Sequence, residues 1–329
     1  MKTLLVADYG VKISTRKGVF VISSRDRRHT VSPSDIDVLV IATSGVSLTS
    51  SAARLAARHG VEIVFLDSSG MPISMLYMPF YTRTPSTRRA QYQVYNDGVG
   101  VEIAVEFAVA KMLNQARHLR WRAVLHHKPG LREAAGVIEE YAEMLSRKRF
   151  NDIDSARRDI MLLEASAARA YWAGIAELLP RDLGFNCRDK DSCDPVNLAL
   201  NYGYGILYPA GFKALLLAGL DPYAGFLHVD RSGKPVLVFD FIEMFRVSVV
   251  DKPLVDLFLR GWRPRVDDCV LSVEDRRVLA EAVVKRFSTR VRGVYDQAAQ
   301  SLEEMMKVYA YRLAKGIRSG SGFRGFIER

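Results

Sequence analysis

The pattern of apolar residues changes once along this chain, and that change constrains its fold more than any other feature. Residues 1–80 hold short runs of β-branched and aromatic residues separated by turn signals, with one helical pattern at 50–58 that ends at Gly60. From about residue 98 onward, the apolar residues recur with the period of an α-helix. A chain of this kind is expected to be α+β, with its strands and its helices in separate parts.

A polar, basic and proline-containing stretch at 82–89 marks the change between the two patterns. We therefore expect a small β-rich N-terminal domain over residues 1–82, a linker over 83–97, and a larger all-helical C-terminal domain over 98–329 that carries one short β-hairpin. The helices predicted in the second domain span 101–125, 132–145, 152–179, 194–218, 241–260, 272–287 and 291–315. The basic tail at 312–329 is rich in Gly and Ser and is expected to be mobile until it meets a polyanion.

The charge balance points to an anionic partner. Lysine and arginine total 47, aspartate and glutamate total 37, and the formal net charge is +10, which favours a nucleic acid. No stretch approaches the ~18 uncharged apolar residues of a membrane span, and Asp8 comes too early for a signal peptide, so we expect a cytoplasmic protein. Three cysteines make neither a disulfide framework nor a zinc site, so free thiols are expected, although a Cys187–Cys193 disulfide stays possible.

Glu164 lies in a long apolar helical segment and is the first candidate for a functional residue. Its helical neighbours at three, four and seven residues are all apolar or aromatic: Ile160, Met161, Ala167, Ala168 and Tyr171. An unpaired charge on such a face costs roughly several kcal/mol. Glu164 is therefore protonated, paired with a cation or bound to a metal ion. Its surroundings do not distinguish a buried Glu–Arg pair from a metal site.

Two further candidates lie close together in the sequence. The segment 226–239 has apolar runs on both sides of a Gly-containing loop, which predicts a β-hairpin with His228 as the polar residue of its first strand. Such a histidine can be a core residue as well as a ligand. Asp240 and Glu243 form either the capping box of a helix or a pair of carboxylates that face one cation.

Taken together, Glu164, His228, Asp240 and Glu243 suit a divalent ion. Oxygen ligands with one imidazole suit Mg²⁺ or Mn²⁺ better than zinc, which prefers Cys and His. Acidic metal ligands inside a basic protein are the combination expected for phosphodiester chemistry. The basic exterior binds the polyanion, while the metal polarises one phosphate and activates an oxygen nucleophile.

Motifs that cover essentially the whole chain carry a family resemblance. In the N-terminal part they are Ser34–Ile41, Ser47–Thr49 and Val61–Asp67, and in the helical part they are Glu164–Trp172, Leu200–Leu207, Gly219–Pro222 leading to Gly225–His228, and Phe239–Arg246. With these motifs the chain resembles the CRISPR-associated Cas1 family, the adaptation nuclease and integrase of spacer acquisition. The spacing from Gly219 to His228, with the acidic segment behind it, is the specific part of the resemblance.

The resemblance implies a set of site residues. It places the family's metal ligands on Glu164, His228 and Glu243, and a second acidic position beside the metal on Asp240. Ala165 departs from the Gly that commonly follows the first ligand in the family, but this change removes no ligand.

Two other positions concern the helical scaffold. Val247 stands where a Pro commonly follows Arg246 in the family, and this departure also removes no ligand. The family's Asn-Tyr-Gly-Tyr helix falls on Asn201–Tyr204, for which we favour close helix packing permitted by Gly203 and Gly205.

The resemblance also implies partners and a reaction. It implies a homodimer formed through the N-terminal domains and a complex with the small Cas2 protein. The implied reaction is attack by the 3′ hydroxyl of a foreign DNA fragment on a CRISPR repeat phosphodiester, with nuclease activity when water attacks instead. Arg88, Arg89, Arg318 and Arg324 are the candidate DNA contacts. Two other readings are a DNA-binding scaffold of the same fold without catalysis, and a metal enzyme that acts on a small anionic substrate.

Overall fold

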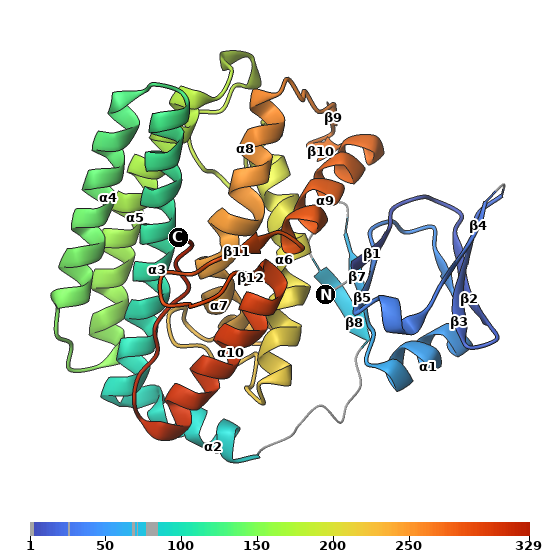
Figure 1. Ribbon diagram of the computed structural model, residues 1–329, viewed down its shortest axis with the longest axis horizontal. Helices are drawn as coiled ribbons and strands as arrows, with labels where there is room; N and C mark the ends of the chain where they lie inside the picture. Colours follow the sequence, from blue (N-terminus) through green and yellow to red (C-terminus); the bar gives the residue numbers. More distant parts are fainter. Residues whose placement is uncertain (1–2, 26, 68–69, 71, 77–84) are drawn as a thin grey trace.

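The computed structural model describes residues 3–25, 27–67, 70, 72–76 and 85–329. It confirms the α+β fold class, because the long strands all lie in the N-terminal part and the remainder is mostly helical (Figure 1). Among the described helices, none combines the length and the apolar character needed to cross a membrane.

The N-terminal part contains two four-stranded sheets, and both follow from its short β-branched runs. The first sheet has the strand order β1-β5-β7-β8, with strands β1 (Thr3–Val6), β5 (Val38–Ile41), β7 (Glu62–Leu66) and β8 (Pro72–Leu76). The second has the order β4-β3-β2-β6, with β2 (Lys12–Arg16), β3 (Val19–Ser23), β4 (Arg28–Val31) and β6 (Ser47–Leu48). Helix α1 (Ser50–His59) connects the sheets, as the sequence predicts, and a 3₁₀ turn covers Pro33–Asp35.

Local chemistry explains one of these connections. Strands β2 and β3 pair through the two-residue turn Lys17–Gly18, in which both residues have positive φ, 49° and 78°. Two consecutive residues in this region make the turn whose twist matches that of a β-hairpin, and Gly adopts it without steric cost.

The helical part is built from elements of very different length. Its helices are α2 (Pro85–Gln93), α3 (Gly98–Leu125), α4 (Pro129–Arg147), α5 (Ile153–Leu178), α6 (Pro195–Leu217), α7 (Val236–Arg246), α8 (Lys252–Leu259), α9 (Val273–Phe287) and α10 (Leu302–Ser319). A π-helical segment, η4 (Val247–Asp251), joins α7 to α8, and 3₁₀ turns cover Val94–Asn96 and Arg181–Leu183. Two short antiparallel pairs complete it: β9 (Val266–Asp267) with β10 (Val270–Leu271), and β11 (Arg290–Val291) with β12 (Gln300–Ser301).

The first sheet joins the two parts, because one of its faces packs against the helical core and the other against the smaller N-terminal core. Along β5, Val38 and Val40 belong to the large helical core, whereas Leu39 and Ile41 belong to the smaller N-terminal core. This alternation is the period-two pattern of a strand, and burial on both faces explains why the strand reads as a continuous apolar run. Lys213 on α6 secures the contact by donating from Nζ to the carbonyl oxygen of Asp37 at 2.7 Å.

The predicted β-hairpin at 226–239 is wrong. Residues 228–235 form an irregular loop, and the second apolar run is the start of helix α7 at Val236. The run continues through Asp240 into the mostly apolar stretch 241–245, and the helix that results is buried on nearly all sides. A short apolar run of this kind cannot be distinguished from a buried helix by its periodicity. The helix predicted at 291–315 also begins later, at Leu302, because β11 and β12 precede it.

Part of the predicted linker at 83–97 is helical. Helix α2 and a 3₁₀ turn occupy residues 85–96, whereas 83 and 84 lie outside the described residues. Gln91 of α2 is almost fully buried, and its Nε2 donates to the carbonyl oxygens of Asp221 at 2.9 Å and Ala224 at 2.8 Å. The segment therefore packs against the loop that leads to His228.

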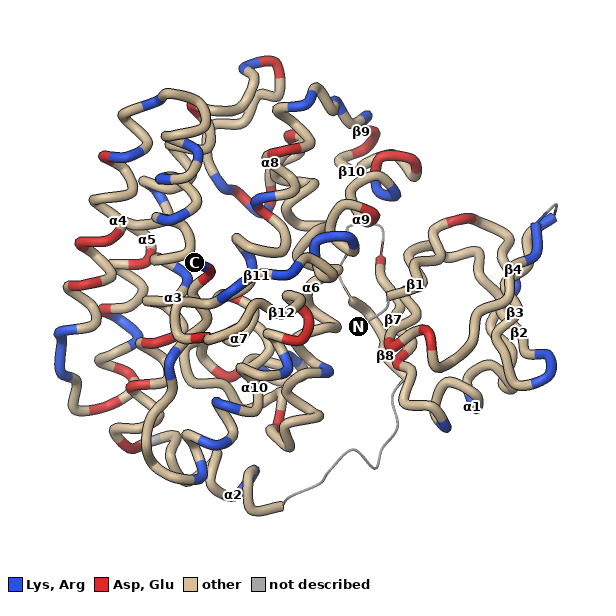
Figure 2. The backbone as a smooth tube through the Cα atoms, viewed as in Figure 1, with Lys and Arg blue, Asp and Glu red and all other residues tan. Residues whose placement is uncertain are grey.

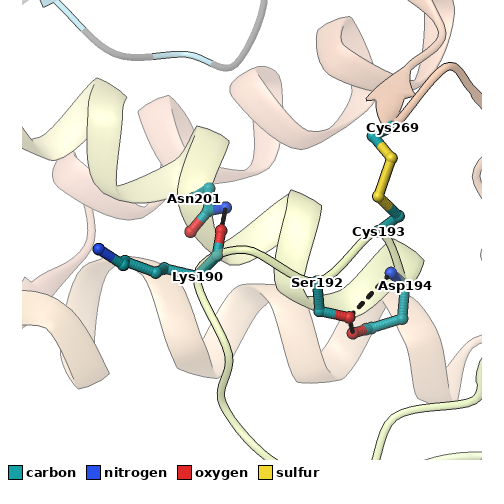
Figure 3. The surroundings of a disulfide bond; sticks show 6 residues. All are labelled: Lys190, Ser192, Cys193, Asp194, Asn201 and Cys269. Atoms are coloured by element: carbon teal, nitrogen blue, oxygen red, sulfur yellow. Dashed lines mark hydrogen bonds between the residues drawn. A yellow bond between two sulfur atoms is a disulfide. The ribbon is translucent and has the colours of Figure 1, made fainter.

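The cysteines pair differently from the expectation. A disulfide joins Cys193 to Cys269, so the expectation of free thiols is wrong for these two residues (Figure 3). Cys187 is a free, exposed thiol, and the possible Cys187–Cys193 disulfide is not formed. Cys193 lies in the loop before α6, and Cys269 lies in the turn between β9 and β10. Their sequence separation of 76 residues hides a contact that only the packing of α6 against β10 creates.

The C-terminal tail is ordered and buried, which contradicts the expectation that 312–329 is mobile. Helix α10 continues to Ser319, and after it Phe323, Phe326 and Ile327 enter the core. The ring of Phe326 stacks on Phe245 with centroids 4.7 Å apart. The side chain of Asn114 donates to the carbonyl oxygen of Phe326 at 2.8 Å. The glycines and cations of this tail suggested mobility, but its three apolar residues provide the burial that outweighs the cost of ordering.

Removal of the Phe326 ring tests the role of the tail in stability. Phe326→Ala is expected to lower the free energy of unfolding by about 3–5 kcal/mol, because it leaves a cavity against Phe245. Arg324→Ala is the control, since that side chain is 72% exposed and its ion pair with Glu106 should contribute less than about 1 kcal/mol. Denaturant unfolding of both variants measures the difference, and equal stabilities would show that the tail does not belong to the core.

Candidate active site

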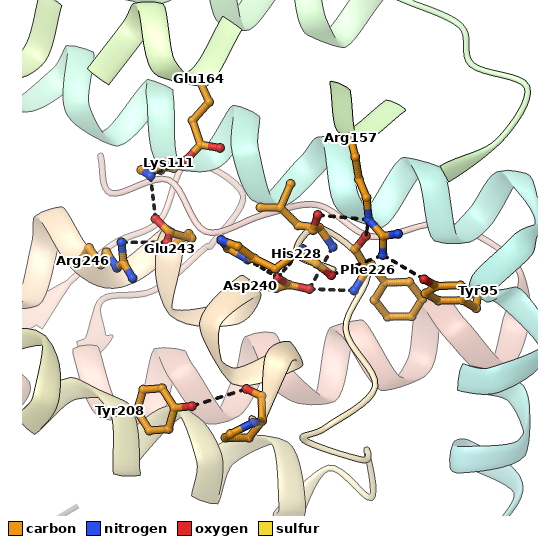
Figure 4. A network of polar contacts seen from close by, with 12 residues as sticks. Tyr95, Lys111, Arg157, Glu164, Tyr208, Phe226, His228, Asp240, Glu243 and Arg246 are labelled. Atoms are coloured by element: carbon orange, nitrogen blue, oxygen red, sulfur yellow. Dashed lines mark hydrogen bonds and ion pairs between the residues drawn. The ribbon is translucent and has the colours of Figure 1, made fainter. Parts of the chain in front are cut away.

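Three helices bring charged side chains together inside the helical part (Figure 4). Lys111 projects from α3, Glu164 from α5 and Glu243 from α7. The Nζ of Lys111 contacts Oε1 of Glu164 and lies 2.8 Å from Oε2 of Glu243. The other oxygen of Glu243, Oε1, forms an ion pair with Nη1 of Arg246 at 2.8 Å. The two carboxylates that the sequence singled out therefore share one cation.

Burial and charge oppose each other in this cluster. Burial alone would raise the pKa of Glu243, which is 2% exposed, but Arg246 and Lys111 outweigh it and hold the pKa at about 2. Burial likewise lowers the pKa of Lys111, and Glu164 and Glu243 more than compensate, so the net shift is upward. The charged forms of Glu243 and Lys111 are thus stabilised by their neighbours.

Asp240 has a different environment from Glu243, although both lie on α7. Its side chain is fully buried, and Oδ2 accepts the backbone N–H of Phe226 at 2.7 Å and of Leu227 at 2.9 Å. Oδ1 accepts the backbone N–H of His228 at 3.0 Å and contacts Nδ1 of the same residue at 2.6 Å. Asp240 therefore holds the segment that carries His228.

The orientation of His228 follows from this contact. A carboxylate only accepts hydrogen bonds, so Nδ1 carries the proton and Nε2 is left for a ligand or a proton. Burial by itself would lower the pKa of His228. The hydrogen bond to Asp240 and the negative charges nearby have the larger effect, so the net shift of the pKa is upward. The side chain is 46% exposed. His228 thus presents one defined nitrogen at the edge of the charged cluster.

The capping box is not the role of Asp240 and Glu243. Helix α7 begins at Val236 with Pro235 as its N-cap, so both acidic residues lie inside the helix. The sequence suggested a cap because the start of the helix was read as a strand. Their spacing of three residues still places them on related faces of α7.

A divalent ion fits these residues by their chemistry. Glu164 and Glu243 already share the ammonium of Lys111, and His228 adds an imidazole nitrogen of defined orientation, which is a donor set suited to Mg²⁺ or Mn²⁺. Over residues 3–25, 27–67, 70, 72–76 and 85–329, no three acidic, His or Cys residues are arranged as a formed metal site. The two carboxylates and the imidazole are thus suitable ligands by their chemistry alone, and in the structure Lys111 is the cation between the carboxylates.

The sequence reasoning missed Lys111 and the support of Arg246. Arg246 lies with its guanidinium 4.7 Å from the ring centre of Tyr204, and the hydroxyl of Tyr204 donates to Oδ1 of Asp251 at 2.7 Å. A cavity of about 460 Å³ opens beside these residues, and it is also lined by Lys111, Arg169 and Arg188. The signal for Lys111 was present, since it is a lone cation in an otherwise apolar helical run, as Glu164 is a lone acid.

The family described as CRISPR associated protein Cas1 matches residues 4–290. The chain belongs to the Cas1 family. It is 35% identical to the CRISPR-associated endonuclease Cas1 2 of Saccharolobus solfataricus over 326 residues, which covers 99% of this chain and 98% of the relative.

Solved structures share the fold of this Cas1 family member. One is a casposase bound to an integration product, with a TM-score of 0.82, 22% identity, and coverage of 98% of this chain and 93% of that one. Another is a Cas6-RT-Cas1–Cas2 complex, with a TM-score of 0.78, 20% identity, and coverage of 98% of this chain and 36% of that one. At these identities the likeness concerns the fold, which agrees with the two-part architecture described above.

Close packing of the Asn201–Tyr204 helix is confirmed. A Cβ added at Gly205 would lie 1.6 Å from the carbonyl oxygen of Gly70, and one at Gly203 would lie 2.5 Å from Val250. These glycines let α6 approach Gly70, between β7 and β8, and the π-helical segment. Tyr204 in addition reaches the charged cluster through Arg246, which the packing interpretation had not included.

The four arginines predicted to contact DNA occupy different settings. Arg88 and Arg89 lie on α2, and Arg318 on α10 donates to Oγ1 of Thr87 at 2.9 Å, so these three are brought together. Arg324 pairs with Glu106 at 2.8 Å. Lys and Arg occur on many other elements of this Cas1 family member as well (Figure 2). The role of the four residues in DNA binding stays a prediction.

The role of Asp240 generates a stability prediction. Asp240→Asn replaces one carboxylate oxygen by an N–H₂ group, which would face N–H donors of 226–228, and each buried donor left unsatisfied costs about 1–3 kcal/mol. We expect the free energy of unfolding to fall by about 2–5 kcal/mol. Asp230→Asn, on the exposed part of the same loop, should change it by less than about 0.5 kcal/mol. Thermal or urea unfolding decides, and an Asp240→Asn protein as stable as the parent would rule out this role.

Proposed function

We propose that this Cas1 family member is a divalent-metal-dependent DNA endonuclease and integrase that inserts foreign DNA fragments as spacers into a CRISPR array. The observation that carries the proposal is the pair Glu164 and Glu243, held on one buried cation beside an oriented His228. The relative with 35% identity over nearly the whole length, named a CRISPR-associated endonuclease, supports it.

The proposed reaction is a transesterification. The 3′ hydroxyl oxygen of the incoming fragment forms a bond to a phosphorus atom of the repeat, and the bond from that phosphorus to the adjacent 3′ oxygen of the repeat strand breaks. The proton of the attacking hydroxyl is lost, and the departing oxygen gains one, so the number of phosphodiester bonds is unchanged. Water in place of the hydroxyl gives strand cleavage.

The chain's own residues divide into ligands and supports. Glu164, His228 and Glu243 would hold Mg²⁺ or Mn²⁺. When bound, such an ion supplies a Lewis acid that polarises the phosphate and activates the oxygen nucleophile. Asp240 keeps the proton of His228 on Nδ1, and Arg246 holds one oxygen of Glu243.

Lys111 places a positive charge among the ligands. In the structure, that charge neutralises Glu164 and Glu243. The buried surroundings strengthen such interactions, because few water molecules screen them. A phosphate group that enters the site would offer the ammonium an alternative anionic partner.

The proposed partners are DNA, the Cas2 protein and a second copy of this chain. The net charge of +10 suits a polyanion. The structural neighbours include a casposase bound to an integration product and a complex whose title names Cas1 and Cas2, which supports DNA and Cas2 as partners. A DNA-binding scaffold without catalysis would not require a carboxylate such as Glu243 in the core, where its desolvation has to be offset by two cationic partners.

Removal of the ligands tests the proposed site. Glu164→Ala and His228→Ala should each lower Mn²⁺-dependent DNA cleavage and strand transfer by roughly a thousandfold or more, since metal assistance supplies several kcal/mol of the barrier reduction. The double change should cost little beyond either single change, because both residues hold one ion. The free energy of unfolding should change by less than about 1 kcal/mol for Glu164→Ala, since Lys111 keeps Glu243 as its partner.

Glu177→Ala is the matched control for the ligand variants. This carboxylate lies on the same helix as Glu164, is 54% exposed and pairs with Lys128. Its removal should leave cleavage and transfer unchanged. Additive losses in the double variant, or full activity in EDTA, would show that Glu164 and His228 do not share a metal ion.

Salt dependence tests the polyanion partner. If six or more phosphates are contacted, the affinity for duplex or branched DNA should fall by about a thousandfold or more between 50 and 200 mM salt. Arg88→Ala and Arg89→Ala should each weaken binding to unrelated sequences alike, because phosphate contacts carry no sequence information. Fluorescence anisotropy with labelled DNA measures both effects. A flat salt titration would contradict a polyanion partner, and a loss confined to one sequence would contradict backbone contacts.

A further inference from the structure

The guanidinium of Arg157 is buried against the chain segment that ends at His228. Its side chain is 7% exposed, and Nε donates to the carbonyl oxygens of Phe226 and Leu227, each at 3.2 Å. Nη2 donates to the carbonyl oxygen of His228 at 3.3 Å and to the hydroxyl of Tyr95 at 3.0 Å (Figure 4). One side chain of α5 therefore binds the carbonyl groups of three consecutive residues.

Asp240 binds the same residues through their other backbone groups. It accepts the backbone N–H groups of 226, 227 and 228, so every backbone polar group of this irregular segment is satisfied by one of two side chains. A segment outside helices and strands has no such partners of its own, and burial without them is costly. The segment 226–228 is thus clamped between a carboxylate and a guanidinium.

The two clamping residues lie on the helices that carry the two carboxylate ligands. Asp240 precedes Glu243 by three residues on α7, and Arg157 precedes Glu164 by seven residues on α5. Seven residues are two helical turns, or about 10 Å along the axis. Each helix therefore presents a carboxylate to the site and, from the same rigid element, fixes the position of His228.

We propose that Arg157 is a positioning residue for the metal site, which sets His228 relative to Glu164. This rests on the proposed function, because it assigns His228 and Glu164 to one ion. A salt bridge is not its main task. Its carboxylate neighbour, Asp154, is 85% exposed at 3.2 Å, and a pair with so exposed a partner is weak. The planar fork of Arg presents its donors on separate nitrogen atoms, here Nε and Nη2, whereas the donors of Lys all lie on one nitrogen atom.

The experiment measures Mn²⁺ binding without DNA, by electron paramagnetic resonance of the free ion. Arg157→Ala should weaken the Kd for Mn²⁺ by about 10–100-fold, which is the usual effect of a residue that orients a metal ligand. Arg157→Lys should recover only part of that loss. Tyr95→Phe removes one partner of Arg157 but keeps the ring, so it should fold normally and shift the Kd in the same direction by less.

Hydrogen exchange provides a readout that needs no metal. The backbone amides of 226–228 should exchange about tenfold faster or more in Arg157→Ala, because the clamp is open on one side. The matched control is Arg158→Ala, which removes the adjacent, exposed arginine of α5. It should change neither the exchange of 226–228 nor the Mn²⁺ affinity.

The outcomes separate the positioning role from the proposed function. If exchange at 226–228 and the Mn²⁺ affinity stay within twofold of the parent in Arg157→Ala and Tyr95→Phe, the positioning role is overturned. If His228→Ala binds Mn²⁺ as tightly as the parent does, the metal site of the proposed function fails instead. Weaker Mn²⁺ binding in Arg158→Ala, equal to that of Arg157→Ala, would also overturn the positioning role, because a general loss of positive charge would then explain both.

Discussion

The carboxylate of Asp240 is buried in the helical part, and the segment 226–228 is arranged around it so that its oxygens accept hydrogen bonds. A buried carboxylate without donors costs several times the energy of an ordinary hydrogen bond, roughly several kcal/mol. Here the donors are the backbone N–H groups of 226–228 and the ring of His228. These contacts hold an irregular segment in the core and orient the imidazole at the same time. The position of His228 therefore depends on a charge that no solvent reaches.

The same requirement explains the charged cluster next to it. Glu243 is almost fully buried and has two cationic partners, Lys111 and Arg246, on different helices. Arg246 is in turn stacked on Tyr204, whose hydroxyl is bound to Asp251. Each buried charge thus specifies the position of the next, which links α3, α5, α6 and α7 around one point. Such networks are sensitive to the loss of any member, because the remaining partners are left unsatisfied.

The surrounding fold supplies the rigidity that this arrangement needs. Helix α3 packs against α4, α5 and α7, and the buried tail closes the core through Phe326 and Asn114. The first sheet of the N-terminal part contributes one of its faces to the same core. Even α2, in the segment expected to be a linker, contacts the loop that leads to His228 through Gln91. The charged cluster is therefore built on helices that belong to one core, and α2 holds the loop that leads to His228.

The sequence by itself determined what local patterns can encode. The period of the apolar residues was sufficient for the α+β class, for most helices and for strands such as β5 and β7. A lone charge in an apolar helical segment identified Glu164, since burial of a charge demands a partner whatever the fold, and the three-residue spacing of Asp240 and Glu243 identified that pair. His228 was a candidate as the polar residue of an apolar run, and the family resemblance implied its role as a ligand. The tertiary structure alone decided the partners: Lys111 lies 53 residues from Glu164, and Arg157 binds carbonyl groups about 70 residues away. It also decided that Cys193 pairs with Cys269 and that the tail is buried. Contacts between distant segments follow from packing, whereas the period of the apolar residues shows which face of an element is buried but not which element packs against that face.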